Sequence, residues 1–388
     1  MRTPILVYLA LTATLFSTSC KPEEEKIAPP DSIHILVDSN SLVLHQDIDS
    51  NIAGITFIPL QSTKDAIIGN IQKIAFTDRK IVLLEKDGQN AIYIFNDDGS
   101  LFKVLRSPGG NHISDFIVQD HRILLFLNIK KTIEFFNEAG EHVRTEQTNP
   151  DLLANSFEHM HNQTYAFWNN TTLTKVGNYR LLTFDNYNEF RMGFLPFSYE
   201  TAKNIASFNE APFNRLSNGV LYVSQPLNDT IWGLDTKEDH MQFYPGYVLE
   251  FQKKPLPPNF VNQPSNYNMF KAADDSNHSY YLKNFMDLDS LVAFKYVSGH
   301  SHYNFLWNKR SKKSMANAEE LGVSKWDLTL PGNMQQVGKN TAVGYYHAYE
   351  LTAWAKSHKN LKTAASLLAI CSHLSDLDNP VLISIEYK

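Results

Sequence analysis

A pattern of short apolar runs and polar turns occurs twice in this chain, with a period of about 41 residues. Residues 74–105 and residues 116–145 each contain four such runs, and in both copies the third run ends in Phe-Asn before a turn with glycine. Four short runs joined by tight turns predict an antiparallel sheet of four strands. A repeat of about 40 to 50 residues built in this way is typical of an all-β fold, the β-propeller, in which each sheet is one blade.

The turns within the repeat have a structural explanation. Residues 96–99 read Asn-Asp-Asp-Gly and residues 137–140 read Asn-Glu-Ala-Gly. Asn, Asp and Gly tolerate the positive φ that tight hairpins need. A calcium site at Asp97 and Asp98 would need further oxygen ligands at a fixed spacing, and these do not follow. We therefore interpret both segments as hairpin turns.

Looser copies of the pattern follow toward the C-terminus. The runs that we assign to further blades lie in residues 161–167, 179–185, 217–235, 280–284, 291–297 and 302–308, and a last blade has to be assembled from residues 337–346 and 381–387. A ring of sheets commonly closes by pairing strands from the two ends of the chain, since closure removes exposed edges. Residues 32–37 and residues 381–387 are both short and β-rich, so either can provide the closing strand.

One segment near the C-terminus has a different pattern. Residues 349–374 contain apolar residues at helical spacing, among them Leu351 and Trp354. We predict one or two helices inserted in the last blade. Because Cys371 falls on the apolar face of this segment, we expect a buried structural thiol, and the only other cysteine is Cys20.

The N-terminus has the features of a lipoprotein signal. Arg2 precedes a mostly apolar run over residues 4–16, small residues follow, and Cys20 comes directly after them. This order is typical of a secretory signal, here residues 1–19, that is too short to span a membrane stably. A cysteine in this position resembles the bacterial lipobox, in which that cysteine is lipid-modified and becomes the first residue of the mature protein. Several acyl chains would anchor it firmly; the alternative is an ordinary signal peptide that contains a cysteine.

Residues 20–32 form a predicted tether. They include the charged run KPEEEK and the segment IAPPD, which cannot bury a core. An acidic run directly after the lipidated cysteine resembles the export signal that places lipoproteins of Bacteroidetes on the outer face of the outer membrane. We therefore expect a protein that is lipid-anchored in the bacterial outer membrane and faces the cell exterior; the alternative is a plain solvated tether.

Residues 33–388 are long enough for a single propeller domain, since propellers grow by adding blades. Without residues 1–19, in which Arg2 is the only charged residue, 34 basic residues stand against 41 acidic ones, a net charge of −7. An acidic chain argues against a nucleic-acid partner, whose phosphates require a basic surface.

A family resemblance covers nearly the whole predicted domain. It rests on residues 54–74, on the hairpin FNDDGSLFKVL, on the stretch YVSQPLNDTIWGLD and on the ending DNPVLISIEYK. Together these segments resemble the six-bladed β-propeller lipoproteins of Bacteroidetes. The resemblance implies six blades and a binding or accessory role near nutrient-uptake systems, and it brings no established catalytic residues to transfer.

Four histidines are candidates for a partial metal site. His159 and His161, like His300 and His302, lie two residues apart and would share one face of a strand. A third ligand is not evident and both pairs fall near predicted turns, so we assign no metal. The chain also lacks a Gly-x-Ser-x-Gly elbow, a Gly-rich phosphate loop and an Asp box. We therefore assign no catalytic residue and no cofactor.

Exposed aromatic rings would indicate a binding face, because sugar rings stack on them. Trp232 and Trp307 fall within predicted strands and are expected to pack between sheets. Trp168 is followed by polar residues, which makes it the best candidate for an exposed ligand contact. Residues 259–269, rich in Asn, Pro and aromatics, are a second candidate for a ligand-contacting face.

The sequence thus predicts a lipid-anchored propeller that binds a glycan, a peptide or an outer-membrane protein partner rather than transforming it. The alternative is a propeller hydrolase or lyase with a metal on its axis. The two hypotheses differ in the channel lining, because an axial metal needs three or more carboxylate, Asn or His side chains that converge from separate blades.

Overall fold

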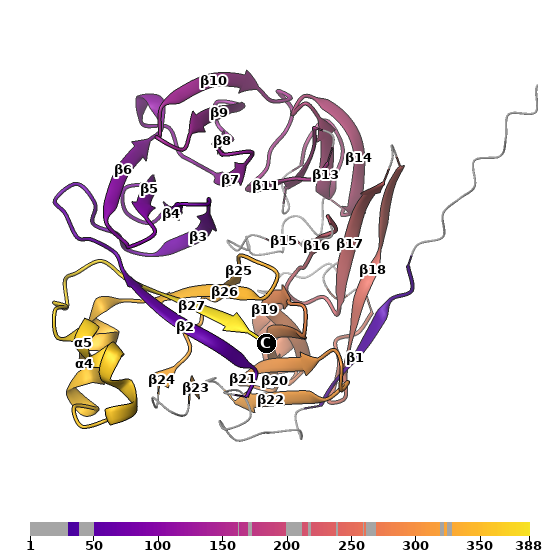
Figure 1. Ribbon diagram of the computed structural model, residues 1–388. Coiled ribbons are helices and arrows are strands. Elements are labelled where there is room, and N and C mark those ends of the chain that lie inside the picture. The colour runs from indigo at the N-terminus through magenta and orange to yellow at the C-terminus, as the bar shows by residue number, and fades with distance from the viewer. Residues whose placement is uncertain are drawn as a thin grey trace, which may run out of the picture.

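The computed structural model shows a ring of six β-sheets around a central axis (Figure 1). Each sheet is one blade, and the blades follow one another around the ring in chain order. The predicted all-β, six-bladed propeller is confirmed. The structure describes residues 30–38, 50–161, 163–169, 173–198, 212–215, 219–237, 240–258, 260, 269–318, 322–323 and 328–388.

The first two blades are the two regular copies of the repeat. Blade 1 consists of β3 (Ile71–Phe76), β4 (Lys80–Glu85), β5 (Ala91–Asn96) and β6 (Leu101–Arg106). Blade 2 consists of β7 (Asp115–Gln119), β8 (Arg122–Leu127), β9 (Thr132–Asn137) and β10 (His142–Gln147). Gly99 and Gly140 have φ values of +84° and +68° in the last hairpin of each blade. Glycine adopts this left-handed conformation without a steric penalty. Both predicted turns are confirmed.

The next three blades carry longer loops. Blade 3 consists of β11 (Ser156–His159), β12 (Thr164–Trp168), β13 (Tyr179–Asp185) and β14 (Glu189–Pro196). Blade 4 contains β15 (Phe213–Arg215), β16 (Leu221–Val223), β17 (Thr230–Lys237) and β18 (His240–Phe251). A short helix, α3 (Met269–Asp275), leads to blade 5, which consists of β19 (Ser279–Asp287), β20 (Leu291–Ser298), β21 (Ser301–Asn308) and β22 (Ser314–Ala318). The predicted later runs fall on strands of these three blades.

Blade 6 closes the ring with strands from both ends of the chain. Its members are β25 (Gln335–Gln336), β26 (Thr341–Tyr346), β27 (Val381–Tyr387) and, outermost, β2 (Ile52–Pro59). Ile55 of β2 lies opposite Ile385 of β27 in an antiparallel register. The expectation that residues 381–387 take part in closure is correct. Residues 32–37 are not the closing strand, because β2 occupies that edge.

Residues 32–37 instead contain β1 (Ile33–Val37), a fifth strand on blade 4. β1 pairs in parallel with β18, with Ile35 opposite Leu249. Ile35 and Val37 are buried while Leu36 is 48% exposed. The Ser314 hydroxyl of β22 donates a hydrogen bond to the Leu36 carbonyl (3.2 Å). The alternating burial fits an edge strand that packs one face on the next blade and leaves the other in solvent.

Two helices lie between β26 and β27, as predicted. They are α4 (Ala348–Ser357) and α5 (Ala365–Cys371), with a 3-10 turn (Lys362–Ala364) before α5. Cys371 is buried against β27, and burial raises the pKa of its thiol to about 11. A two-stranded sheet of β23 (Gly322–Val323) and β24 (Leu328–Thr329) precedes blade 6. Among the described residues, no helix has the length and apolar character needed to cross a membrane.

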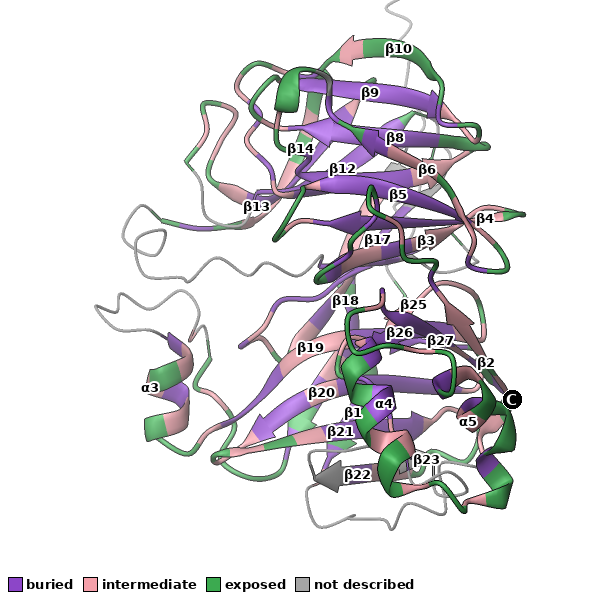
Figure 2. Cartoon of the chain, turned by 90° about the vertical axis from the view of Figure 1, so that its left-hand side faces the viewer, coloured by how far each residue is buried: buried purple, intermediate pink, exposed green. Residues whose placement is uncertain are grey.

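The core lies between neighbouring blades rather than at the axis. Figure 2 shows the central strands of the blades as mostly buried. Val82 of β4 and Phe116 of β7, for example, belong to one cluster between blades 1 and 2. Trp307 is 5% exposed in a cluster between blades 4 and 5, and Trp232 packs against the cluster between blades 3 and 4. Both tryptophans therefore pack between sheets, as expected from their strand positions.

Candidate functional site

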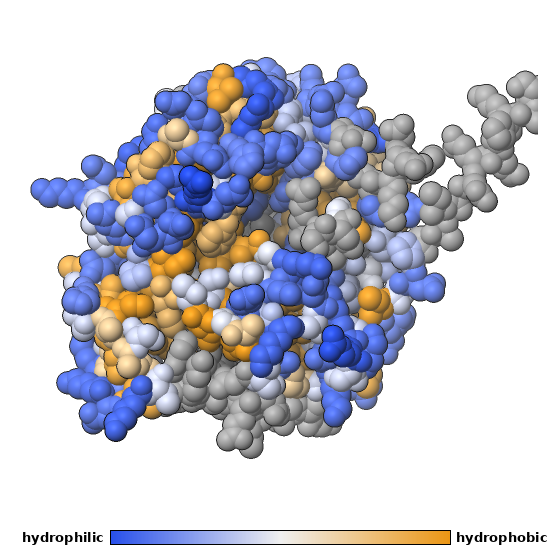
Figure 3. All heavy atoms as spheres, viewed as in Figure 1, coloured by the Kyte–Doolittle hydropathy of each residue, from blue (hydrophilic) through white to orange (hydrophobic). Residues whose placement is uncertain are grey.

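The inner strands of the six blades enclose a central cavity. Its volume is about 1040 Å³, and β3, β7, β11, β15, β19 and β25 all contribute to its wall. Figure 3 shows the hollow near the middle of the face, bordered by both hydrophobic and hydrophilic residues. We call this cavity the axial channel. It is the candidate functional site, because concave pockets of this size with convergent polar groups are where small molecules bind.

One end of the axial channel is formed where the inner strands begin. In blades 1 to 5 the chain runs through four consecutive antiparallel strands from the inner one to the outer one. It therefore leaves the fourth strand on the side where it entered the first. The starts of all inner strands therefore share one mouth, which we call the entry mouth. Residues that line it include Asn70, Lys86, Asp87, His112 and Asn155.

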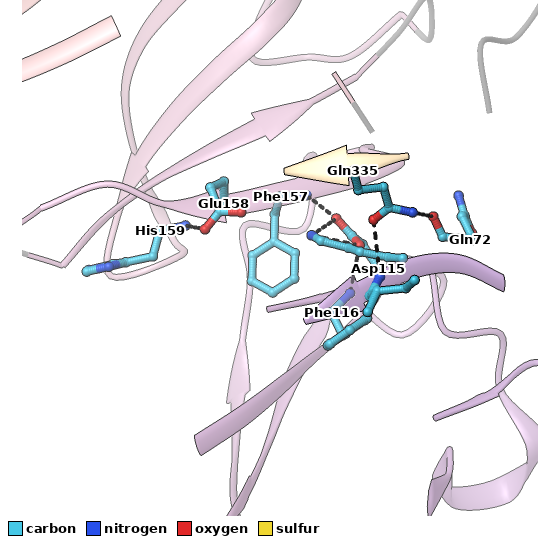
Figure 4. Close-up of polar contacts among 9 residues, drawn as sticks. Gln72, Asp115, Phe116, Phe157, Glu158, His159 and Gln335 are labelled. Atoms are coloured by element: carbon cyan, nitrogen blue, oxygen red, sulfur yellow. Dashed lines mark hydrogen bonds and ion pairs between the residues drawn. The ribbon is translucent and has the colours of Figure 1, made fainter. Parts of the chain in front are cut away.

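Side chains of the inner strands hydrogen-bond from blade to blade around this wall. Lys73 of β3 lies 3.2 Å from both carboxylate oxygens of Asp115 on β7. The same carboxylate accepts hydrogen bonds from the backbone N–H of Phe116 (2.8 Å) and of Phe157 on β11 (3.0 Å). Figure 4 shows Asp115 at the centre of these contacts. One buried acid thus connects blades 1, 2 and 3.

Two glutamines of β25 connect blade 6 to its neighbours, blades 1 and 5. The Gln335 side chain accepts from the Ile74 backbone N–H (3.2 Å) and donates to the Gln72 carbonyl (3.1 Å), which ties blade 6 to blade 1 (Figure 4). The Gln336 side chain bonds in the same way to both backbone groups of Asp287, at 2.8 and 2.9 Å. It ties blade 6 to blade 5.

Most asparagine side chains that line the axial channel are also bonded to the protein. Asn214 donates to the Phe285 carbonyl (2.5 Å) and Asn284 donates to the Gly332 carbonyl (2.8 Å). The Asn333 oxygen accepts from Tyr345 (2.9 Å), the Asn128 oxygen accepts from Lys131 (3.2 Å), and Asn70 donates to Asp87 (2.8 Å). These amides position backbone and neighbouring side chains, so they are poor candidates for metal ligands.

Lys86 and His112 stand out among the groups at the entry mouth. Burial lowers the pKa of Lys86, an effect that the nearby charges of Asp115 and Asp87 oppose. Burial also lowers the pKa of His112, and the positive charge of Lys86 lowers it further. In the described part of the chain, the Lys86 ammonium has no hydrogen-bond or ion-pair acceptor. The entry mouth therefore holds a partly desolvated cation.

The sequence did not single out Lys86 or His112, although the repeat contains a signal for the first. Lys86 comes directly after the second strand of blade 1, and Asn128 and Ser224 come directly after the second strands of blades 2 and 4. All three line the axial channel. Alignment of the blades on their second strands would therefore have identified this channel-facing position.

The position of Trp168 differs from the expectation. Trp168 is the last residue of β12 and is 1% exposed, so the predicted exposure is wrong. It packs with Leu181 and Leu234 between blades 3 and 4. Its backbone pairs with Ser156 and Leu181 inside the sheet, at the end of β12. Because Trp168 still lines the axial channel, its contact with a ligand stays a prediction.

The described residues around the two histidine pairs do not supply further metal ligands. The His159 ring packs against Tyr165, with ring centroids 5.0 Å apart, and His161 is exposed. His300 and His302 are exposed at the hairpin between β20 and β21. Within the described ranges, no group of three or more His, Cys, Asp and Glu side chains could hold a metal ion. Cys20 and, within the proposed binding loop, residues 259 and 261–268 lie outside the described residues.

Comparisons with known proteins agree with the fold. The model of a family described as a domain of unknown function (DUF4934) matches residues 36–386. A crystal structure of a Bacteroides fragilis NCTC 9343 protein named as exported is similar to this chain, with a TM-score of 0.72 and 14% identity, over 92% of this chain and 100% of that one. At this identity the likeness shows the fold alone.

A second solved structure is more distant. It is a member of the DUF4221 family from Bacteroides vulgatus ATCC 8482, with a TM-score of 0.48 and 11% identity, over 87% of this chain and 97% of that one. This likeness is too weak to carry an argument. No curated protein matches the chain.

Proposed function

The chain belongs to the DUF4934 family of domains of unknown function, and on that premise we propose that it is a cell-surface binding protein whose ligand occupies the axial channel. The observation that carries the proposal is the channel itself. It has a volume of about 1040 Å³ and is lined by side chains from all six inner strands. A cavity of this volume accepts a ligand of the size of a short oligosaccharide or peptide.

The character of the lining favours binding over catalysis. Several amides of the wall and the carboxylate of Asp115 are already bonded to the protein, which makes the wall a preorganised scaffold. Preorganisation favours affinity, since little side-chain freedom is lost when a ligand binds. A hydrolase or lyase with an axial metal is the alternative, and the described residues contain no cluster of acidic, His and Cys ligands that supports it.

The proposed location rests on the N-terminal sequence. Cys20 after the small residues of a signal peptide, followed by the acidic tether, supports a lipid anchor and display on the outer face of the outer membrane. The similar Bacteroides fragilis protein is named as exported. That name is consistent with passage of this chain across the inner membrane. From such a position, the protein would act as an accessory binding component for the uptake of a glycan or a peptide, or would bind an outer-membrane protein partner.

A capture experiment tests the channel as the ligand site. The full-length protein is immobilised and incubated with oligosaccharides and peptides from growth medium, and the retained molecules are identified by mass spectrometry. Asn155→Trp places a large ring in the entry mouth, and we expect it to remove the retained molecules. Val143→Trp on the outer strand β10, where Val143 is 49% exposed, is the matched control and should retain them. Equal retention by both variants would place the ligand site elsewhere.

A further inference from the structure

Building on the proposed function, we infer that the axial channel takes an acidic saccharide, with the carboxylate of the ligand bound to Lys86 at the entry mouth. The ligand's hydroxyl groups bond to amides of the wall, and its apolar ring face lies against aromatic side chains. The inference rests on three features of the channel: an ammonium group whose neighbouring acids are occupied, an excess of lysines in the lining, and aromatic rings on the wall.

The acids near Lys86 are already bonded to other groups. The Asp115 carboxylate accepts from Lys73 and from two backbone N–H groups, so its oxygens are saturated. Asp87 accepts from the Asn70 amide (2.8 Å). The carboxylates of Asp115 and Asp87 therefore act on the Lys86 ammonium through their charge and form no hydrogen bond with it. A ligand carboxylate could approach the ammonium directly and form a charge-assisted hydrogen bond, which is about twice as strong as a neutral one.

Lysines outnumber carboxylates among the side chains that line the axial channel. The described residues that line the axial channel include four lysines and two carboxylates, namely Lys73, Lys86, Lys283, Lys339, Asp87 and Glu158. The chain as a whole carries a net charge of −6. Two of the lysines are paired, Lys73 with Asp115 and Lys339 with Asp289 (3.0 Å). These pairs neutralise two of the four lysines, and Lys86 remains as a cation at the entry mouth that an anionic ligand can approach.

The remaining lining has the composition of a sugar site. Phe76 of β3 and Phe213 of β15 line the axial channel and are partly exposed. The Asn155 side chain also lines it and makes no hydrogen bond to another described residue. A sugar ring presents an apolar C–H face to aromatic rings and hydroxyl groups to amides, so this mixture fits a saccharide better than a bare inorganic anion.

The ionisation of the entry mouth makes binding depend on pH. Burial lowers the pKa of Lys86, and a bound carboxylate would raise it again, because an opposite charge favours the ammonium form. Binding should therefore weaken as the pH rises toward the ordinary lysine range. Burial and the charge of Lys86 both lower the pKa of His112, which favours its neutral form, and the neutral ring can donate one N–H. The other charged groups that face Lys86 are Lys73, Asp87 and Asp115.

Calorimetric titration of the full-length protein tests this inference. The probes are galacturonate, glucuronate and N-acetylneuraminate, with galactose as the neutral match and inorganic phosphate as the bare anion. We expect at least one acidic sugar to bind at least tenfold more tightly than galactose and phosphate. Lys86→Met should reduce that affinity about tenfold, which corresponds to about 1.4 kcal/mol. Lys175→Met, which removes an exposed lysine paired with Asp151 (3.3 Å) and not among the residues that line the axial channel, should leave it unchanged.

Several outcomes would overturn the inference. If galactose binds as tightly as the acidic sugars, or if Lys86→Met binds them like the wild type, the channel still binds a ligand but Lys86 does not select an acid. If phosphate binds as tightly as the sugars, the site is a general anion site and not a saccharide site. If none of the acidic sugars binds, the inference fails, while the capture experiment decides the proposed function independently.

Discussion

Lys73 on β3 and Asp115 on β7 form an ion pair of 3.2 Å that joins the inner strands of blades 1 and 2. Their side chains are 16% and 5% exposed. Because Asp115 also accepts a backbone hydrogen bond from blade 3, its carboxylate holds three blades together at the channel wall. The contact therefore links the stability of the ring to the shape of the proposed binding site.

Replacement of Asp115 with Ala should be strongly destabilising. It leaves Lys73 without its partner and two buried N–H groups without an acceptor, and the removal of one partner of a buried pair costs roughly 3–5 kcal/mol. Urea unfolding followed by tryptophan fluorescence measures the loss. Arg144→Ala, which breaks an exposed ion pair with Glu146 (2.6 Å), is the matched control and should cost about 1 kcal/mol or less. Similar losses in both variants would contradict the structural role of Asp115.

Gly99 should not tolerate alanine. Its φ is +84°, and an added Cβ would lie 2.1 Å from the Pro59 carbonyl oxygen at the end of the closing strand β2. Gly110 has a similar φ of +70°, with nothing within 4 Å of the corresponding Cβ position. We expect Gly110→Ala to cost about 1–2 kcal/mol from backbone strain alone. Gly99→Ala should cost roughly 2 kcal/mol more because of the clash. Thermal unfolding of the two variants checks the difference, and equal losses would mean that β2 does not lie against this turn.

Ile35 and Leu36 should respond differently to truncation. Ile35 is fully buried between β1 and blade 5, whereas Leu36 is 48% exposed. Ile35→Ala should cost about 2–4 kcal/mol through the cavity it leaves, and Leu36→Ala about 0.5 kcal/mol. Hydrogen exchange of the β1 amides shows whether the loss is local to β1 or global. Equal protection of β1 in the two variants would argue against this packing.

The Cys371 thiol should be inert in the folded protein. Burial raises its pKa to about 11, so almost none of it is thiolate at pH 8. We expect Ellman's reagent to react with Cys371 only after denaturation, in the Cys20→Ala variant where no other cysteine remains. The buried, protonated thiol contributes to the free energy of unfolding below pH 9. This contribution is lost as the pH rises toward 11, because the Cys371 thiol ionises first in the unfolded chain. Fast labelling under native conditions would contradict the burial of this thiol.

Cys20 should determine membrane attachment. Cys20→Ala removes the residue that resembles the lipidation site, and we expect the protein to move from the membrane fraction to the soluble periplasmic or secreted fraction. Membrane retention of the variant would contradict the anchor. Substitution of Glu23, Glu24 and Glu25 with Ala should keep the protein in membranes but reduce its digestion by protease added to whole cells. Unchanged digestion would remove the role of the acidic run in export.

Local signals in the sequence were sufficient for most strands. β3 to β10 could be predicted because apolar runs of strand length alternate with polar turns such as Asn-Asp-Asp-Gly and Asn-Glu-Ala-Gly, whose backbone conformation depends on adjacent residues alone. The helical insertion could be predicted for the same reason, since the spacing of Leu351 and Trp354 is a property of one segment. The number of blades came from the family resemblance, because the later loops obscure the period.

The closing strand and the exposure of Trp168 could not be predicted from local patterns. Both β1 and β2 have strand-like composition, and only the geometry of the closed ring decides that β2 pairs with β27, more than 300 residues away, while β1 joins blade 4. The polar residues after Trp168 indicated an exposed ring, but the burial of Trp168 depends on Leu234 of the next blade. Burial between blades is a property of two sheets, not of one.

The sequence by itself therefore determined the repeating blades, the helical insertion and the N-terminal segment from which the anchor is inferred, since each is written in neighbouring residues. Only the tertiary structure decided what faces the axis. Lys86, His112 and Asn155 lie on separate loops and strands, and they meet at the entry mouth because each blade returns the chain to the same side of the ring. The candidate site is a product of that closure, which no single segment encodes.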